Sequence, residues 1–217
     1  MILVKPSFEI MTDIRTIPKI LSIIEDAGRT CYKSEKRGEP HLFVASLIKR
    51  GHESVIEHAN ISVKIICDRG VTHEIVRHRL ASYSQESTRY CNYKGGVTFV
   101  IPPWIKFDAG EYNHKFCSSW EVPFNADQTW FASMLDHEDQ YISLLKMDWS
   151  PQQARSVLPN SLKTEIVMTC NLREWRYIFK LRISSAAHPQ MREIMIPLLE
   201  KFKEIIPVVF EDIQINK

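Results

Sequence analysis

Alternation of apolar and polar residues marks the predicted strands of this chain. Residues 60–66 alternate strictly and predict a strand with one buried face. Residues 163–170 alternate in the same way and are rich in β-branched side chains. Shorter apolar runs at residues 2–4 and 97–101 predict two further strands, and two prolines stop the second.

Apolar residues that recur every three or four positions predict helices elsewhere. The predicted helices cover residues 18–26, 40–50, 71–76, 127–146, 172–182 and a last helix from Pro189 that Pro197 and Pro207 kink or break. Gly28 and Gly51 are expected to end the first two helices. Asn171 is a suitable N-cap for residues 172–182. Ser150 and Gln153 predict a capping box for a short helix that carries Arg155.

The helix predicted over residues 172–182 has two faces. One face is apolar and predicts a buried stripe of Trp175, Ile178 and Leu181. The opposite face is basic and contains Arg173, Arg176 and Lys180. A solvated surface is the ordinary interpretation of such a basic face.

The chain as a whole mixes helices and strands without an internal repeat. Residues 104–126 contain scattered aromatic side chains without a sustained period, so an irregular segment packed on the core is expected there. A length of 217 residues suits a single domain over residues 1–217.

Composition excludes several classes of protein. The 28 Lys and Arg residues against 26 Asp and Glu leave a charge of +2, which indicates neither a nucleic-acid nor a membrane partner. The five cysteines form no C-x-x-C pair, so neither a disulfide framework nor a structural zinc site is predicted. The chain lacks a signal-peptide pattern and a long apolar run, which favours a cytoplasmic protein. No glycine-rich phosphate loop is present, so a bound nucleotide would be held by side chains and helix ends.

The most unusual segment is residues 77–90, with the sequence RHRLASYSQESTRY. It begins with Arg77, His78 and Arg79 and continues with six hydroxyl side chains. The three cationic or titratable groups follow a predicted helix, whose C-terminus favours cations. A chain leaving the helix can direct them toward one large anion or two adjacent anions; a solvated basic turn is the alternative.

Two histidines stand close together upstream of this segment. His52 and His58 are six residues apart beside Glu57, which is not the i, i+4 spacing of a helical zinc pair. No metal site is therefore expected. A capping role and a place in the wall of a ligand site are the two alternatives for these histidines.

Four motifs resemble those of the flavin-dependent thymidylate synthases. Residues 77–79 (RHR), followed after seven residues by Ser87, are similar to the signature of that family. Residues 51–58 (GHESVIEH) resemble its upstream Gly-His element at the expected distance. Two further motifs match the second half of the family sequence in order and spacing. One is residues 154–159 (ARSVLP), and the other is the pair of segments 169–173 (TCNLR) and 181–182 (LR).

The resemblance implies a fold and an activity. The implied fold is α+β, with a curved mixed or antiparallel sheet flanked by helices, the thymidylate synthase-complementing protein fold. The implied activity is the conversion of dUMP to dTMP, with 5,10-methylenetetrahydrofolate as carbon donor and NADPH as reductant through bound FAD. The implied assembly is a cytoplasmic homotetramer whose sites are built from several subunits, with no nucleic acid, membrane or metal involved.

The resemblance also assigns roles to single residues. It places Arg182 as the group that activates the pyrimidine and Ser87 as a hydroxyl that positions dUMP rather than an activated nucleophile. Its FAD contacts correspond to His52, Ser54, Arg77, His78, Arg79, Gln85, Asn171, Arg173 and Tyr177. Its dUMP contacts correspond to Glu74, Arg77, Gln85, Glu86, Ser87, Thr88, Arg89, Arg155 and Arg182.

The chain departs from the family pattern at a few positions. Glu74 stands where a glutamine often contacts the substrate, Cys31 replaces a serine, Ser84-Gln85 replaces Asn-Glu, and Tyr177 replaces His or Asn.

Two rival functions remain open on the residues alone. One is a nucleic-acid-binding module that uses Arg69, Arg77, Arg79 and Arg89 on phosphates, with a steep salt dependence. The other is a nucleotide-modifying enzyme of the same fold without flavin.

Overall fold

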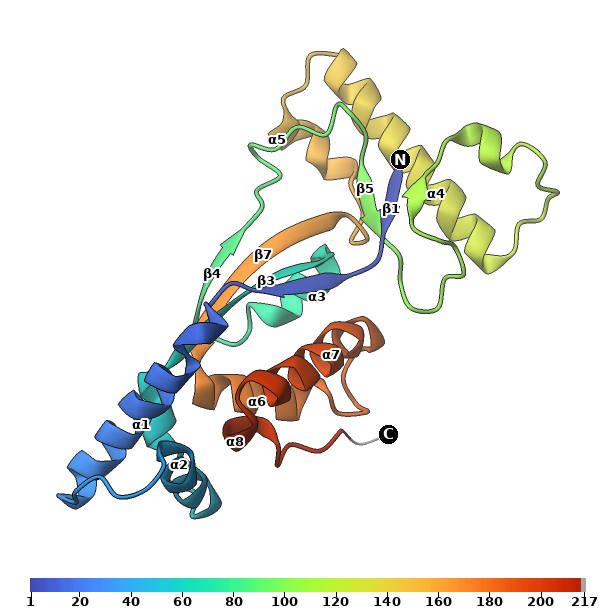
Figure 1. Ribbon diagram of the computed structural model, residues 1–217. Helices are drawn as coiled ribbons and strands as arrows, with labels where there is room; N and C mark the ends of the chain where they lie inside the picture. The colour runs from blue at the N-terminus through green and yellow to red at the C-terminus, as the bar shows by residue number, and fades with distance from the viewer. Residues whose placement is uncertain (216–217) are drawn as a thin grey trace. The chain divides into compact units, whose positions relative to one another are not determined.

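The computed structural model describes residues 1–215, which form helices and two open sheets (Figure 1). The strands are β1 (Ile2–Val4), β2 (Ser7–Ile10), β3 (Asn60–Asp68), β4 (Ala81–Gln85), β5 (Thr98–Val100), β6 (Gly110–Glu111) and β7 (Lys163–Asn171). The α-helices are α1 (Ile17–Tyr32), α2 (Pro40–Lys49), α3 (Arg69–Ile75), α4 (Ala126–Lys146), α5 (Pro151–Ala154), α6 (Leu172–Arg182), α7 (Pro189–Ile205) and α8 (Pro207–Phe210). Short 3-10 helices are η1 (Ile14–Thr16), η2 (Glu53–His58), η3 (His114–Cys117) and η4 (Arg155–Val157). This mixture of helices with open sheets agrees with the predicted α+β class.

The chain divides into two compact units. Unit 1 contains residues 1–7, 65–76 and 84–166, and unit 2 contains residues 8–64, 77–83 and the described residues from 167 onward. Strands β3, β4 and β7 each begin in one unit and end in the other. The expectation of one domain over residues 1–217 stays a prediction.

The core of unit 1 forms between a small mixed sheet and α4. Strand β1 pairs in parallel with β5 and antiparallel with β6, so the order is β5-β1-β6. Leu3 of β1 lies opposite Phe99 of β5, and both side chains are buried with Phe131 of α4. The irregular segment 104–126 adds Phe107 and Trp120, whose rings lie 4.7 Å and 5.3 Å from the Phe131 ring. The prediction that this segment packs on the core is confirmed.

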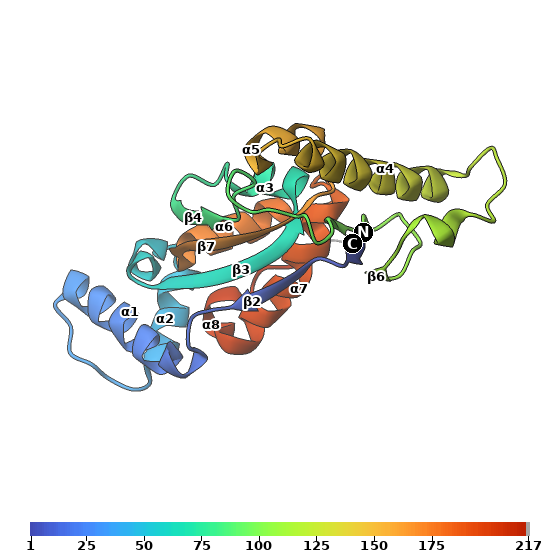
Figure 2. The same ribbon diagram turned by 90° about the horizontal axis from the view of Figure 1, so that it is seen from above.

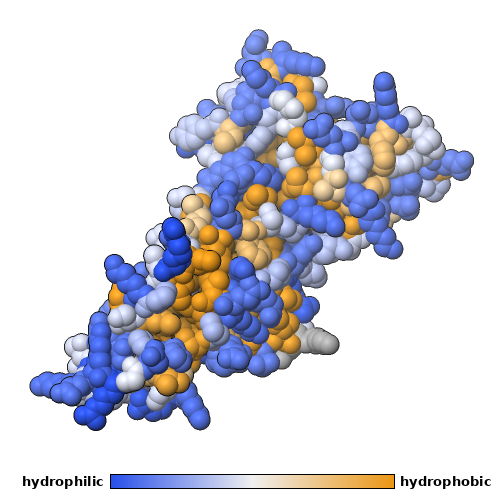
Figure 3. Space-filling view, viewed as in Figure 1, coloured by the Kyte–Doolittle hydropathy of each residue, from blue (hydrophilic) through white to orange (hydrophobic). Residues whose placement is uncertain are grey.

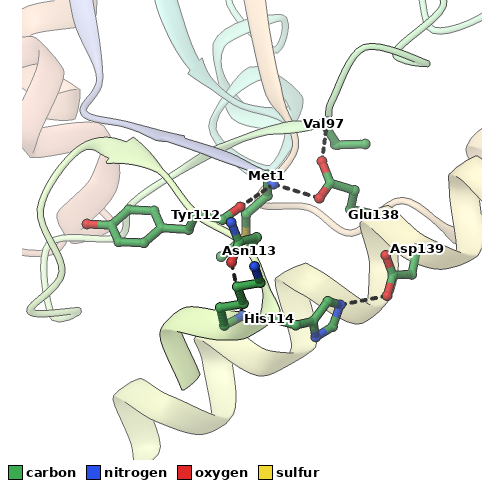
Figure 4. Close-up of polar contacts among 8 residues, drawn as sticks. Met1, Val97, Tyr112, Asn113, His114, Glu138 and Asp139 are labelled. Carbon is green, nitrogen blue, oxygen red and sulfur yellow. Dashed lines mark hydrogen bonds and ion pairs between the residues drawn. The ribbon is translucent and has the colours of Figure 1, made fainter. Parts of the chain in front are cut away.

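A buried ion pair ties the beginning of the chain to α4. The Met1 amino group lies 2.6 Å from Glu138 Oε2 and 2.8 Å from the Tyr112 carbonyl oxygen (Figure 4). The other carboxylate oxygen of Glu138 accepts a hydrogen bond from the Val97 N–H at 2.8 Å. Separation of these groups would leave a buried charge without a partner, which is costly. The contacts therefore fix β1 and the start of β5 against α4.

The core of unit 2 is aromatic and centred on α6. The Trp175 and Phe179 rings contact the Phe202 ring of α7, and Phe202 contacts Phe210 of α8. Helices α6, α7 and α8 therefore lie together in Figures 1 and 2. Trp175 Nε1 donates to the Ile61 carbonyl oxygen at 3.0 Å, which attaches α6 to β3.

The second sheet has the strand order β2-β3-β7-β4. Burial alternates along β3 and β7, as their sequences predict, because successive side chains point to opposite faces. Strand β4 was not among the predicted elements, since its sequence Ala-Ser-Tyr-Ser-Gln is polar. It forms because a neighbouring strand satisfies its backbone groups; the Glu86 N–H still donates to the Glu165 carbonyl oxygen at 2.8 Å.

Glycine behaves differently at the two predicted helix ends. Gly51 follows α2 with φ +75°, in the left-handed region that glycine favours, as predicted. The prediction for Gly28 is wrong, because α1 continues through it to Tyr32. A Cβ at position 28 would lie 2.7 Å from Leu47 and 2.8 Å from Phe43. Gly28 therefore serves close packing between α1 and α2 rather than helix termination.

The basic face predicted for α6 is not uniformly solvated. The Arg176 side chain is 2% exposed and donates two hydrogen bonds to the Asp212 carboxylate, at 2.6 Å and 2.7 Å. Its guanidinium also contacts Glu53 and the Val209 carbonyl oxygen. The solvated interpretation is wrong for Arg176, and the predicted burial of Leu181 is also wrong, since Leu181 is 45% exposed.

Unit 2 also exposes apolar side chains. Leu80, Tyr177 and Leu181 are all exposed. In Figure 3, hydrophobic surface drawn in orange lies beside hydrophilic residues drawn in blue. Exposed apolar area of this kind can mark a contact surface. Within residues 1–215, no helix is both long enough and apolar enough to cross a membrane.

Candidate active site

The predicted site residues separate into two groups, one in each unit. The predicted flavin residues lie mainly in unit 2, namely His52, Ser54, Arg77, His78, Arg79, Asn171, Arg173 and Tyr177, together with Arg182. The other predicted dUMP residues lie in unit 1, namely Glu74, Gln85, Glu86, Ser87, Thr88, Arg89 and Arg155. Each group is described within its own unit.

A cavity of about 320 Å³ in unit 2 contains three predicted flavin residues. His52, Ser54 and Arg173 line it together with Cys31 and Tyr32. The Tyr32 hydroxyl is hydrogen-bonded to His52 Nδ1, and the two rings stack with centroids 6.1 Å apart. Gly51 and His52 lie in the short turn between α2 and η2, and this turn brings His52 to the cavity.

A second cavity in unit 2, of about 430 Å³, shares Arg173 with the first. It is also lined by Asn171 and Tyr177, the other predicted flavin residues of α6 and its cap. Asn171 Oδ1 accepts the Glu174 N–H at 2.8 Å, which fixes the start of α6 at the cavity wall. Arg173 Nη1 donates to Glu57 Oε1 at 2.5 Å, and this hydrogen bond raises the pKa of Arg173. Arg173 therefore presents a permanent positive charge between the two cavities.

His78 and Arg182 form a hydrogen-bonded pair although they are 104 positions apart. Arg182 Nε donates to His78 Nε2 at 2.9 Å, so Nε2 is the acceptor and the ring proton is on Nδ1. Nδ1 faces Glu174 Oε1 at 3.7 Å. Burial, and secondly the charge of Arg182, lower the pKa of His78 to about 4. His78 is thus a neutral acceptor that orients the Arg182 guanidinium.

The three residues of the RHR motif do not share one environment. The helix α3 ends at Ile75, and the motif follows its C-terminus as predicted. His78 is 5% exposed, and its ring contacts the Tyr177 ring edge-on at 6.1 Å. Arg77 and Arg79 are exposed and line none of the cavities described here. The motif therefore supplies one buried orienting group and two surface cations.

Unit 1 contains a polar cavity of about 450 Å³ with two arginines. Arg155 of η4 and Arg69 at the start of α3 line it, together with Thr88. Arg155 Nη1 donates to Thr88 Oγ1 at 3.1 Å. Arg69 Nη1 is buried and has no hydrogen-bond partner among the described residues. Two guanidinium groups line this cavity, so it suits an anionic ligand.

Residues 85–89 comprise the last residue of β4 and the turn after it, and hydrogen bonds hold them in place. Gln85 Nε2 donates to Thr72 Oγ1 at 3.1 Å and to Thr164 Oγ1 at 3.2 Å. Ser87 Oγ accepts the Arg89 N–H at 3.3 Å, and the Ser87 carbonyl oxygen accepts the Cys91 N–H at 2.9 Å. Arg89 is exposed, and Glu74 is partly buried on α3. Ser87 and Arg89 therefore lie on the same turn as Thr88, which lines the polar cavity of unit 1.

The sequence did not reveal several residues of these two groups. Arg69 is a candidate from the sequence only for contacts to nucleic acid, and its position in the turn after a predicted strand was the available signal. Tyr32 contacts His52, and Tyr93 and Lys163 contact Glu86. No motif or helical spacing connects these pairs, which are separated by 7 residues (Glu86–Tyr93), 20 residues (Tyr32–His52) and 77 residues (Glu86–Lys163).

The donors around the two cavities of unit 2 suit a flavin nucleotide. Its ring carbonyls and phosphates accept hydrogen bonds, and Arg173, His52, Ser54 and the Asn171 amide are donors. The Tyr177 ring, 57% exposed, can pack against a planar ligand. Among residues 1–215, no three His, Cys, Asp or Glu side chains are grouped as metal ligands.

Known proteins are similar to nearly the whole chain. The sequence model of the family described as thymidylate synthase complementing protein matches residues 14–208. A flavin-dependent thymidylate synthase of Mycolicibacterium gilvum is 34% identical over 206 residues, which are 90% of this chain and 80% of that protein. The flavin-dependent thymidylate synthases of Mycobacterium tuberculosis and Mycobacterium avium are 34% identical over 203 and 202 residues. These two alignments cover 90% and 89% of this chain and 80% of each relative.

Proposed function

The chain belongs to the thymidylate synthase complementing protein family, and we propose that this enzyme methylates dUMP to dTMP with a bound flavin. The carbon donor is 5,10-methylenetetrahydrofolate, the reductant is NADPH and the flavin is FAD. The observation that carries the proposal is the similarity over 90% of the chain to proteins named flavin-dependent thymidylate synthase.

Unit 2 is the proposed flavin-binding part of the enzyme. When bound, FAD supplies hydride transfer from NADPH toward the carbon that the folate donates. Arg173 and Asn171 hold the cofactor from the start of α6, and His52 and Ser54 hold it from the start of η2. Arg77, Arg79 and Gln85 are further proposed contacts. The charge of Arg173 suits the phosphates or the negative charge that develops on a reduced flavin ring.

Arg182 is the proposed catalytic residue. Methylation at C5 of uracil builds negative charge on the N3–C4–O4 system, and a guanidinium can stabilise that charge through forked donors. His78 accepts from Arg182 Nε and so holds the guanidinium in one orientation. Because His78 is neutral, it does not compete with the substrate for the positive charge.

Unit 1 is the proposed binding site for the dUMP phosphate. Arg155 and Arg69 supply donors in the polar cavity, and Ser87, Thr88 and Arg89 lie on the adjoining turn. Ser87 positions the nucleotide by hydrogen bonding. Glu74, Gln85 and Glu86 contribute to the same part of the site, and Arg77 contacts both dUMP and FAD.

Further proposals concern assembly and location. The two units act as one functional domain with the thymidylate synthase-complementing protein fold. The enzyme is a cytoplasmic homotetramer in which several subunits complete each site. The exposed apolar side chains Leu80, Tyr177 and Leu181 support self-association, since they are ordinary contact residues once a partner covers them.

The proposal is tested with the purified, flavin-reconstituted protein. We expect the visible absorbance of an oxidised flavin, and dTMP from dUMP only when the folate and NADPH are both present. Omission of either co-substrate is the control. A protein that stays colourless after incubation with FAD and forms no dTMP contradicts the proposal.

Replacement of either cavity arginine is expected to weaken dUMP binding. Arg69→Met and Arg155→Met each remove a charged donor from the phosphate, so the dissociation constant should rise about 10- to 100-fold. Isothermal titration calorimetry measures this constant. Deoxyuridine lacks the phosphate, so its weaker binding should not change in either variant.

A lysine on the exposed end of α4 provides the matched control. Lys146→Met also removes a positive charge from unit 1 but lies away from the cavity lining. It should bind dUMP like the wild type. Unchanged dUMP binding by both arginine variants would show that the phosphate is held elsewhere.

A further inference from the structure

Glu86 is held from two sides by residues that no motif assigns. Its Oε1 accepts the Tyr93 hydroxyl at 2.7 Å, and its Oε2 lies 3.1 Å from Lys163 Nζ. The Glu86 and Lys163 side chains are only 18% and 20% exposed. Lys163 also contacts Glu165 at 2.5 Å, so it lies between two carboxylates.

Both partners of Glu86 are fixed in unit 1. The Tyr93 ring packs against the Tyr141 ring of α4 at 5.8 Å, and Tyr93 contacts the hydrophobic core. Burial, followed by the hydrogen bond to Glu86, raises the pKa of Tyr93, so its hydroxyl stays protonated as the donor. Lys163 opens β7 and directly precedes Thr164, which accepts from Gln85. The Glu86 carboxylate is therefore tied to both a core-packed loop and the start of a strand.

Stability alone does not account for this arrangement. A largely buried ion pair loses much of its Coulomb energy to desolvation. An apolar pair of similar size often gives the folded protein equal stability. A fully satisfied polar network does, however, restrict the backbone that carries it to one geometry. The backbone in question is position 86, between Gln85 and the turn that begins at Ser87.

The turn after Glu86 leads directly to the proposed phosphate site. Thr88 is 6% exposed and accepts from Arg155, which lines the polar cavity with Arg69. A shift of residue 86 would move Ser87 and Thr88 relative to both arginines. Because charged hydrogen bonds depend on geometry, such a shift would weaken dUMP binding without removing any group that contacts it.

We propose that Tyr93 and Lys163 are positioning residues for dUMP binding that act by holding the Glu86 carboxylate. The inference rests on the proposed function, because it assigns dUMP to the cavity beside Thr88. The new element is that two residues outside the predicted site, Tyr93 and Lys163, fix the backbone of the 85–88 segment.

The test compares dUMP binding by the flavin-loaded wild type, Tyr93→Phe and Lys163→Met. Each variant should raise the dissociation constant about tenfold, the loss expected for one hydrogen bond to a charged group. The KM for dUMP should rise in parallel, while kcat at saturating dUMP and the flavin spectrum should stay at the wild-type level. Lys163→Arg retains a cation for Glu86 and should recover most of the affinity.

Two control variants match the chemistry of the changes. Tyr112→Phe removes another tyrosine hydroxyl of unit 1, which donates to Asp108 on the surface. Lys201→Met breaks an exposed pair with Glu204 on α7. Both should bind dUMP like the wild type.

A double variant tests whether the residues act through Glu86. If they do, Glu86→Gln with Lys163→Met should lose no more affinity than the larger of the two single changes, because both remove the same contact. Additive losses would overturn the inference, as would wild-type dUMP binding by Tyr93→Phe and Lys163→Met. If Lys163→Met does not fold, Tyr93→Phe decides the question. A wild type that does not bind dUMP would instead contradict the proposed function.

Discussion

The Arg182→Ala variant is expected to retain bound flavin but to form dTMP about 10³-fold more slowly than the wild type, the size of effect seen when one aligned charge-stabilising donor is lost. The proposed role of Arg182 is to stabilise the negative charge that builds on uracil during attack by C5. The change leaves Arg173 and Asn171 in place, so cofactor binding should be preserved. Single-turnover measurement of dTMP with the flavin-loaded enzyme determines the rate.

A second readout shows whether the Arg182–His78 pair is present in solution. The charge of Arg182 contributes to the low pKa of His78, about 4. In Arg182→Ala this pKa should rise, but it should stay below 6.5 because burial, the larger cause, remains. Nuclear magnetic resonance titration of the His78 ring measures the change.

Lys180→Ala is the matched control for Arg182→Ala. Lys180 also lies in the last turn of α6 and is exposed. This variant should retain both the rate of dTMP formation and the pKa of His78. If Arg182→Ala forms dTMP at the wild-type rate, the proposed catalytic role is wrong.

The Arg176→Met variant is expected to lose about 2–3 kcal/mol of the free energy of unfolding, because it removes charged hydrogen bonds between a buried guanidinium and partly exposed carboxylates. Methionine fills much of the space but leaves Asp212 and Glu53 without their cation. It also leaves the Val209 carbonyl oxygen without the Arg176 donor. Urea unfolding of the flavin-free protein, followed by far-ultraviolet circular dichroism, measures the loss.

Arg173→Met is the matched control on the same helix. Arg173 pairs with Glu57 on the surface, and the two side chains are 52% and 43% exposed. Surface pairs contribute little to stability, so the urea midpoint should stay close to that of the wild type. Equal midpoints for Arg173→Met and Arg176→Met would mean that Arg176 is not buried as described.

Much of the local structure follows from short-range patterns. Asn171 caps α6 through its side chain, Ser150 and Gln153 form the predicted capping box, and Gly51 follows α2 in a left-handed conformation. The alternation in β3 and β7 gives the predicted buried and exposed faces. These features depend on neighbours within a few residues, which is why they can be predicted without the fold.

The motifs also predict part of the candidate site. His52, Ser54 and Arg173 line one cavity, and Arg173, Asn171 and Tyr177 line a second. Thr88 and Arg155 line the cavity of unit 1. The roles of these residues toward FAD and dUMP stay predictions. The sequence does not distinguish buried His78 from exposed Arg77 and Arg79, because all three follow one helix end.

By itself, then, the sequence determined the main helices and strands, their caps, and the family to which the chain belongs. Only the tertiary structure decided that Arg176 is buried while Arg173, on the same helix, is exposed, because the partners Glu53 and Asp212 are distant in sequence. It likewise decided that Gly28 packs against Phe43 and Leu47, and that Arg69 and Arg155 share a cavity. The physical reason is the same in each case: the free energy of burying a charge or a small residue depends on neighbours that only folding brings together.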